Sequence, residues 1–224
     1  MQVWDFASRL RGSGLLRVNI PQRESSPRPA PCGSFFGSTL YDLPPDHDLP
    51  HLRAAIRLCR SHELAIDGGA HRGIWSREMR RHFKSVVSIE PVEENAKHIE
   101  AGVVLLAALG AEPGTARMQA GTENTGQWHH DPEAEQGQEA PIITIDALAL
   151  AQVSLLKLDV EGMELFALKG AEQTIRDWRP VIVVEMNGLH RRYGTKDGET
   201  ELWLMQHGYR LAEQLNKDQI WVWQ

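Results

Sequence analysis

The sequence predicts an α/β fold in which helices cover both faces of a mostly parallel sheet. From about residue 51 onward, short apolar segments alternate with stretches of helical periodicity, which is the pattern of a doubly wound sheet. Most apolar segments are hydrophobic along their whole length, as in strands buried on both faces. The 224 residues, 42% of them hydrophobic, can supply the core of one domain.

Residues 1–50 differ from the rest because they contain seven of the twelve prolines, with polar residues between them. Such a segment does not sustain a long helix or a central strand. We therefore divide the chain into an N-terminal extension, residues 1–50, and a domain, residues 51–224. The extension is interpreted either as a flexible or surface-bound segment or as a lid over a cleft, since it also carries Phe35, Phe36 and Tyr41.

The first half of the domain begins with an amphipathic helix, because Leu52, Ala55 and Ile56 recur at helical spacing with arginines on the other face. The segments that follow alternate between strand and helix. In chain order they are strand 64–66, helix 74–82, strand 85–89, a helix from Glu93, and strand 103–109.

The second half opens with an irregular stretch. Residues 110–140 are polar and rich in turn-forming residues, so we interpret them as a long insertion, and residues 141–148 then alternate like a strand. The remaining elements are strand 153–158, helix 162–178, strand 180–186, and a terminal hairpin of residues 208–215 and 219–223.

Bulk properties narrow the function classes. The formal net charge of −6 and the sequence pI of about 5.9 argue against nucleic acid as the main partner. No 18 apolar residues run together and no signal peptide is recognisable, which predicts a soluble, cytoplasmic protein with no membrane partner. Cys32 and Cys59 lie far apart, so neither a disulfide framework nor a zinc cluster is predicted.

The stretch LAIDGGAHRGIWS places three glycines and an acid in the turn that follows the first strand. Glycine allows a ligand to approach the backbone, and the following helix presents free N–H groups. A dinucleotide fingerprint would read GxGxxG, whereas this turn reads D-x-G-x-x-x-G over Asp67, Gly69 and Gly73. An acid there would repel a pyrophosphate and suits a ligand that carries positive charge or hydroxyls.

Glu90 follows the second strand, 23 positions after Asp67, where Rossmann-like folds place the carboxylate that binds ribose hydroxyls. S-adenosylmethionine carries an ammonium group, a sulfonium and a ribose, so the two acids and the glycine turn match it. The simpler alternative is that Asp67 caps the next helix and Glu90 is an exposed surface charge.

Five segments resemble, in this order, the FkbM family of S-adenosylmethionine-dependent methyltransferases: IDGGAHRGIWS, VVSIEPVEEN, ITIDAL, LLKLDVEGMELFALKGAEQTI and RPVIVVEMN. The resemblance covers about residues 60–190. It implies a class I methyltransferase fold, with a Rossmann-like sheet of seven strands of which the last is antiparallel, S-adenosylmethionine as cofactor, and methylation of a hydroxyl on a sugar or natural product.

The resemblance also assigns residues. It places the cofactor loop at Asp67, Gly69 and Gly73 and the ribose acid at Glu90, and it matches Asp159, Glu161, Gly162 and Glu164 to a D-x-E-G-x-E block. His71 and Arg72 depart from the small or amide residues that such loops often carry. Together the predicted cofactor contacts are Asp67, Gly68, Gly69, Ala70, His71, Gly73, Glu90, Pro91, Ala108 and Asp159.

The acidic block suggests the catalytic groups. Asp159 ends an apolar strand, on the side of the sheet where ligands bind, and Asp159 or Glu161 could accept the proton of a hydroxyl nucleophile. With Glu185 and Asn187 these acids could also offer oxygen ligands to a divalent cation, although we predict no metal ligand. Glu164 is interpreted as a charge that favours the start of its helix.

Four further residues are predicted to contact the substrate. Trp128 and His129 belong to the long insertion, in a loop beside the cofactor edge, and His190 and Arg191 follow strand 180–186, where arginine would suit an anionic acceptor. For each pair the alternative is a solvated surface.

The predicted function is thus O-methylation of a small-molecule acceptor. The alternatives are an NAD-dependent oxidoreductase and a cofactor-binding module without turnover.

Overall fold

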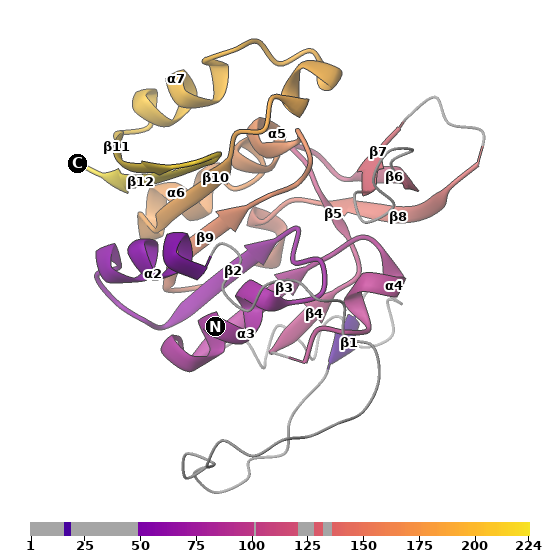
Figure 1. The fold of residues 1–224 in the computed structure, drawn as a ribbon, viewed down its shortest axis with the longest axis horizontal. Helices are drawn as coiled ribbons and strands as arrows, with labels where there is room; N and C mark the ends of the chain where they lie inside the picture. Colours follow the sequence, from indigo (N-terminus) through magenta and orange to yellow (C-terminus); the bar gives the residue numbers. More distant parts are fainter. Residues whose placement is uncertain (1–15, 19–48, 101, 121–127, 132–135) are drawn as a thin grey trace, which may run out of the picture.

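The structure is a computed structural model that describes residues 16–18, 49–100, 102–120, 128–131 and 136–224. The predicted lid with Phe35, Phe36 and Tyr41 lies outside these residues, as does most of the proline-rich extension. The described residues form an α/β unit with one large sheet and one small sheet (Figure 1).

The large sheet has the strand order β1-β4-β3-β2-β9-β10-β12-β11. Strands β2, β3, β4, β9 and β10 are parallel, and β12 runs antiparallel to β10 and β11. The predicted seven strands with an antiparallel last strand are therefore present, and β1 adds an eighth strand, antiparallel to β4. Their bounds are β1 Leu16–Val18, β2 Leu64–Gly68, β3 Ser85–Ile89, β4 Val103–Leu105, β9 Val153–Leu158, β10 Val181–Glu185, β11 Tyr209–Leu215 and β12 Asp218–Trp223.

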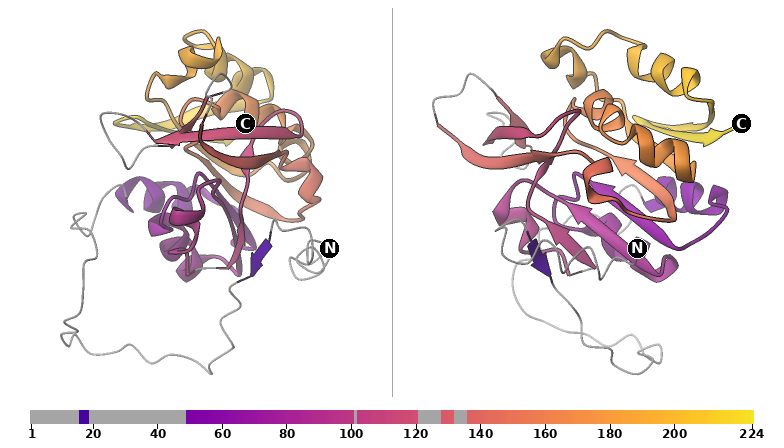
Figure 2. Two further views of the ribbon diagram at one scale, coloured as in Figure 1. Left: turned by 90° about the vertical axis from the view of Figure 1, so that its right-hand side faces the viewer. Right: turned by 180° about the vertical axis from the view of Figure 1, so that it is seen from behind.

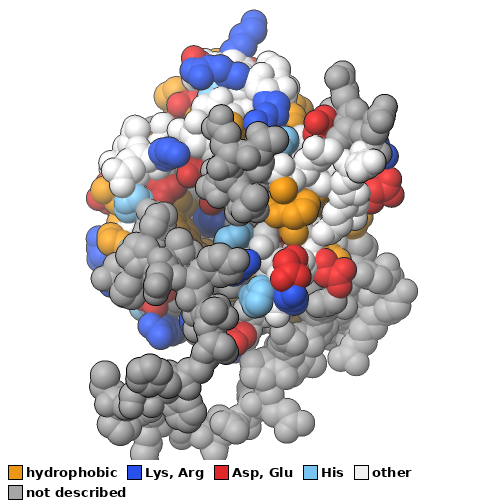
Figure 3. Space-filling view, turned by 45° about the vertical axis from the view of Figure 1, so that its right-hand side comes forward, with side chains coloured by type: hydrophobic (Ala, Val, Ile, Leu, Met, Phe, Trp, Pro, Cys, Tyr) orange, Lys and Arg blue, Asp and Glu red, His pale blue; other side chains and the backbone are white. Residues whose placement is uncertain are grey.

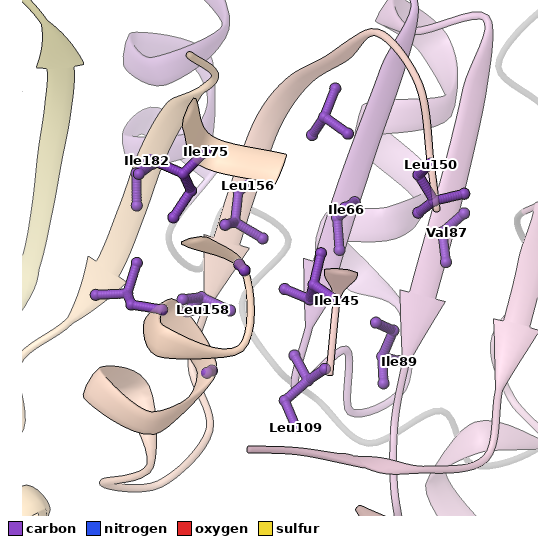
Figure 4. Packing of buried hydrophobic residues seen from close by; sticks show 14 of the residues in the cluster. Ile66, Val87, Ile89, Leu109, Ile145, Leu150, Leu156, Leu158, Ile175 and Ile182 are labelled. Atoms are coloured by element: carbon purple, nitrogen blue, oxygen red, sulfur yellow. The ribbon is translucent and has the colours of Figure 1, made fainter. Parts of the chain in front are cut away.

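Helices pack on both faces of this sheet (Figure 2), because its central strands are apolar on both sides. In β2, Leu64 and Ile66 point to the face covered by α5, α6 and α7, and Ala65 points to the face covered by α2 and α3. Figure 4 shows the first of these layers, with Ile66 close to Leu156 and Ile145. The helices are α2 Leu49–Leu58, α3 Ile74–His82, α4 Glu93–Ala96, α5 Glu164–Lys169, α6 Glu172–Trp178 and α7 Glu199–Gln206, with 3₁₀ turns η1 Asp146–Leu148 and η2 Leu189–Tyr193.

The helix predicted over residues 162–178 is instead two helices, α5 and α6, which meet at Gly170. A Cβ on Gly170 would lie 2.1 Å from the carbonyl oxygen of Gly110, so this close approach requires glycine. Asp146 then caps α6, because its Oδ1 accepts hydrogen bonds from the Thr174 backbone N–H at 2.8 Å and hydroxyl at 2.7 Å. The distant residues that break the helix leave no periodic signal in the sequence.

A second correction concerns residues 103–143. The strand predicted over 103–109 divides into β4 and β5 Ala108–Leu109, and the insertion contributes β6 Gly114–Ala120 and β7 Trp128–His130. The strand predicted over 141–148 is instead β8 Gln138–Ile143, and the 3₁₀ turn η1 follows it. These four strands form a small sheet of order β5-β8-β6-β7 that projects from the large one (Figure 1).

Trp128 and His129 therefore lie in a strand and not in a loop. The small sheet buries Ala116 and Met118 of β6 against Val92, which is too little apolar surface to stand out in a polar sequence.

Candidate active site

A cavity of about 650 Å³ opens at the carboxyl ends of the parallel strands, where open α/β sheets bind ligands. Its floor comes from the segments that follow β2, β3 and β9 and from Glu185 at the end of β10, and β6 and β7 of the small sheet contribute to its walls. Figure 3 shows acidic, basic and histidine side chains interspersed on the side of the molecule that it presents. Among the coloured residues, neither positive nor negative side chains predominate.

The glycine turn forms one part of the floor. Gly69 and Gly73 have left-handed φ angles of +70° and +78°, and the N–H groups of Gly69 and Ala70 both donate to the carbonyl of Ile89. A Cβ on Gly69 would lie 1.7 Å from the carbonyl oxygen of Asp159. Position 69 therefore excludes any side chain, and the glycine turn packs directly on the backbone of the acidic turn.

Asp67 lies behind this loop and does not line the cavity. Its carboxylate is fully buried; Oδ2 accepts a hydrogen bond from Ser76 Oγ at 2.6 Å, and Oδ1 lies 3.1 Å from Lys157 Nζ. It does not cap α3 either, since the N-cap position is Gly73 and no side chain bonds there. The carboxylate that was predicted to bind the cofactor instead neutralises a buried lysine.

Glu90 does line the cavity, at the end of β3. Oε2 accepts the backbone N–H of His71 at 2.8 Å, and Oε1 accepts that of Val92 at 3.0 Å and lies 3.5 Å from Asn95 Nδ2. Burial raises the pKa of Glu90, against the opposing effect of these donors. A carboxylate offers about four lone-pair sites, so acceptor capacity remains for a hydroxyl ligand.

Three carboxylates gather in the part of the cavity that the acidic turn and the end of β10 form. Asp159 and Glu185 follow in-register residues of the adjacent parallel strands β9 and β10, and Glu161 lies in the next turn with a φ of +54°. Asn187 Nδ2 donates to Glu185 Oε2 at 2.7 Å and lies 3.5 Å from Glu161 Oε2. The amide therefore holds the two glutamates side by side.

Crowding of these acids changes their protonation. Burial, followed by the charges of Asp159 and Glu164, raises the pKa of Glu161 to about 7. Burial and Asp159 raise the pKa of Glu185 to about 8. Both glutamates therefore exchange protons in the physiological range, which suits general acid–base work.

Glu164 has a different position. It is buried, and its Oε1 accepts the backbone N–H groups of Val160 at 3.1 Å and Gly162 at 3.0 Å. A Cβ on Gly162 would in turn lie 2.7 Å from the backbone of Leu189. The D-x-E-G-x-E block is thus a backbone turn that Glu164 braces, with Asp159 and Glu161 left facing the cavity.

Aromatic and histidine side chains line the walls of the cavity. Trp128, His130 and Met118 come from the small sheet, and His51 comes from α2. The Tyr193 hydroxyl donates to the His130 carbonyl at 2.8 Å, and the two rings stack with centroids 6.4 Å apart. This contact fixes β7 against η2.

A sequence comparison identifies the family. The family model described as the methyltransferase FkbM domain matches residues 67–211, which includes both cavity-lining turns. The chain belongs to the FkbM methyltransferase domain family. No curated protein matches the chain in a sequence search.

The chain of this FkbM domain is similar to solved methyltransferase structures, and the first of them supports the fold. A methyltransferase FkbM from Methylobacillus flagellatus KT is 18% identical with a TM-score of 0.53, over 73% of this chain and 44% of that one. The match thus spans less than half of that relative. A magnesium protoporphyrin IX methyltransferase from Synechocystis PCC 6803, solved with bound SAM, is 14% identical with a TM-score of 0.43, covering 80% of this chain and 78% of that one.

The structure separates the predicted site residues into two groups. Those that line the cavity are Gly69, Ala70, His71, Glu90, Pro91, Ala108, Trp128, Asp159 and Glu161. Those that do not are Asp67, Gly68, Gly73, His129, His190 and Arg191. His190 and Arg191, both in η2, bond to the Asp197 carboxylate at 2.9 and 2.7 Å. The arginine that was predicted to suit an anionic acceptor is therefore paired with an acid of this chain.

Sequence reasoning missed several members of the site. Glu185 was considered only as a metal ligand, although its place at the end of an apolar strand was the same signal that selected Glu90. Lys157 is hidden inside strand β9, and His51 comes from the first helix, so nothing in the local sequence marked them.

In the described part of the FkbM chain, no group of three or more His, Cys, Asp or Glu side chains has an arrangement that could hold a metal ion. None of the helices there has the length and apolar character needed to cross a membrane.

Proposed function

We propose that the chain is a methyltransferase that uses S-adenosylmethionine to methylate a hydroxyl group of a small sugar or natural product. The observation that carries the proposal is one cavity that joins the glycine turn and Glu90 to the carboxylates Asp159, Glu161 and Glu185. Membership in the FkbM family supports the reaction class. The sugar or natural-product acceptor is what the resemblance to this family implies, and the carboxylates and Trp128 of the cavity support a hydroxyl-bearing ligand.

The residues present fit the cofactor. The cavity, about 650 Å³, is large enough for a nucleoside ligand, since small-molecule sites span about 300–1,000 Å³. Glu90 would accept ribose hydroxyls, and the backbone of Gly69 and Ala70, which lines the cavity, would lie against the ligand. The acidic cluster provides negative charge for the cationic end of the ligand. When bound, S-adenosylmethionine supplies an electrophilic methyl group on a sulfonium.

The chain itself has two tasks, alignment and proton removal. Alignment alone can supply about 7–11 kcal/mol of the barrier, and the rigid packing of the glycine turn on the acidic turn serves it. Asp159, Glu161 and Glu185 offer oxygen acceptors for the hydroxyl proton of the acceptor. Trp128 provides an aromatic face on which a sugar ring can stack.

Calorimetric titration with S-adenosylhomocysteine tests the cofactor part of the proposal. We expect the wild-type chain to bind, and Glu90→Ala to weaken binding by about tenfold or more, as expected for the loss of a charged hydrogen-bond acceptor. Glu100→Ala removes an exposed acid nearby and serves as the matched control, with affinity within about twofold of wild type. Equal affinity of Glu90→Ala and wild type would remove Glu90 from the site.

Transfer of an isotopically labelled methyl group tests the reaction. The acceptors are a panel of monosaccharides and polyhydroxylated natural products, each paired with a derivative whose hydroxyl groups are already methylated. We expect labelled product only from free hydroxyls. Binding of S-adenosylhomocysteine without transfer to any acceptor would favour the non-catalytic module instead.

A further inference from the structure

Lys157 is a buried cation at the boundary of the proposed cofactor site, and the reaction described above does not use it. It lies near the end of β9, is 7% exposed, and lines the cavity between the glycine turn and the acids. Burial by itself would lower the pKa of its ammonium, but Asp67 and Asp159 reverse this and raise the pKa above its ordinary value. Lys157 is therefore charged when folded.

The contacts of the ammonium join three segments of the chain. Nζ donates to the carbonyl oxygen of Gly69 at 2.7 Å, lies 3.1 Å from Asp67 Oδ1, and lies 3.7 Å from Asp159 Oδ2. A lysine ammonium has three donors and no acceptor. One of them bonds to the Gly69 carbonyl, and the two carboxylates compensate the charge as ion pairs. Through one atom, the cofactor loop is tied both to the strand before it and to the acidic turn.

The partners are themselves fixed. Asp67 accepts a hydrogen bond from Ser76 of α3, and Ser76 contacts Ser88 of β3 at 2.8 Å. Position 69 packs on the Asp159 carbonyl so tightly that it admits no Cβ. The bond from Lys157 to the Gly69 carbonyl thus fixes the peptide plane at the point where the loop meets the acidic turn.

We propose that Lys157 is a positioning residue for cofactor binding, which holds the Gly69 carbonyl and thereby fixes the glycine turn in its ligand-accepting conformation. The inference rests on the proposed function. It differs from the role that sequence reasoning gave to Asp67, because the acid acts only by compensating the charge of Lys157. A purely structural alternative is that Lys157 does no more than neutralise Asp67.

Two variants separate these roles. In Asp67→Asn, Lys157 loses its nearest carboxylate, so we expect a less stable chain. Lys157 still keeps its bond to Gly69 and its contact with Asp159, so the folded fraction should bind S-adenosylhomocysteine within about twofold of wild type. In Lys157→Met/Asp67→Asn, both charges are removed together, which avoids leaving a buried charge without a partner. We expect this double variant to fold, as checked by thermal unfolding, and to bind S-adenosylhomocysteine about tenfold or more weakly because the bond to Gly69 is lost.

Each outcome of the titration has one meaning. A folded double variant that binds as well as wild type overturns the positioning role and leaves the structural alternative. An Asp67→Asn variant that loses binding as severely as the double variant also overturns it, since the acid would then act directly. A wild-type chain that fails to bind S-adenosylhomocysteine contradicts the proposed function itself.

A measurement on the wild-type chain keeps the inference testable if the double variant does not fold. The ¹⁵N resonance of a buried lysine ammonium can be followed by NMR. We expect the Lys157 Nζ resonance to shift on addition of S-adenosylhomocysteine and that of exposed Lys84 to stay unchanged. A Lys157 resonance that does not respond to saturating ligand would contradict the positioning role.

Discussion

Gly69 is the residue at which the cofactor loop and the acidic turn touch. Its left-handed φ of +70° and the 1.7 Å between a hypothetical Cβ and the Asp159 carbonyl oxygen impose two separate constraints, one on backbone conformation and one on space. The spacing of glycines in the sequence predicted the first. The second depends on the carbonyl of Asp159, a residue that is distant in the chain, which no local pattern reveals.

Replacing Gly69 with alanine tests both constraints. Left-handed strain costs about 1–2 kcal/mol, and forcing extra atoms into a packed position adds about 1–3 kcal/mol. Gly194→Ala is the matched control, because its φ is +77° but nothing lies within 4 Å of its Cβ, so only the first cost applies. Chemical denaturation should show Gly69→Ala as clearly the less stable variant. Equal losses of unfolding free energy in the two variants would mean that the glycine turn moves to accommodate the added methyl group at position 69.

Glu185 gives a prediction about pH. Its pKa of about 8 and that of Glu161 near 7 mean that both carboxyls ionise as the pH rises from about 6 to 9. Glu185 faces the carboxylates of Glu161, Asp159 and Asp218. The basic side chains of Lys157, Lys217 and His51 line the same cavity. If ionised Glu185 accepts the hydroxyl proton, kcat should rise through this range with an upper midpoint near 8.

Glu185→Gln should remove the upper midpoint and lower kcat by about 10²–10⁴-fold. Affinity for S-adenosylhomocysteine should change little, and Glu213→Gln, on exposed β11, should leave the profile unaltered. A profile that keeps its midpoint near 8 in Glu185→Gln would assign the titration to a different group.

At the scale of elements, the small sheet β5-β8-β6-β7 shapes one wall of the cavity. It packs few apolar residues of its own, and its outer strand β7 is held by the Tyr193 hydroxyl and ring. The wall that carries Trp128 and His130 therefore depends on η2, an element that follows β10 and lies next to the acidic turn.

Tyr193→Phe removes this hydroxyl but keeps the aromatic ring. Losing one neutral hydrogen bond costs about 0.5–1.5 kcal/mol, here mostly in the local stability of β7. We expect faster amide hydrogen exchange at residues 128–130, a higher KM for the acceptor, and unchanged affinity for S-adenosylhomocysteine. Exchange rates equal to wild type at these residues would show that β7 is held by other contacts.

At the scale of the whole molecule, the strand and helix order from residue 64 to 223 could be predicted because the central strands are continuously apolar and the turns carry glycine. The division of one predicted helix at Gly170 could not, since it arises from contact with Gly110. The small sheet could not either, because its strands are polar and short. Of the site, strand-end acids were predictable, whereas the inward turn of Asp67 toward Lys157 depends on a residue buried in another strand.

The buried acids also give the folded chain a pH-dependent stability. Glu161 and Glu185 have folded-state pKa values of about 7 and 8, whereas an ordinary glutamate has a pKa of 4.5. Between pH 4.5 and these higher values, the folded state therefore holds protons that the unfolded chain releases. Stability must then fall as the pH rises from about 5 to 8. Urea unfolding should show a smaller decline in Glu185→Gln, and an identical pH slope in this variant and wild type would contradict the shifted pKa.

The central claim is that a single cavity brings a nucleoside cofactor at Glu90 to the acids of β9 and β10. A crystal structure of the chain with S-adenosylhomocysteine tests it most directly. The account predicts that the ribose hydroxyls bind the Glu90 carboxylate and that the ligand lies against the protein backbone at Gly69. It also predicts that the thioether sulfur is directed toward Asp159 and Glu185. A ligand bound elsewhere, or one whose sulfur points away from these carboxylates, would contradict it.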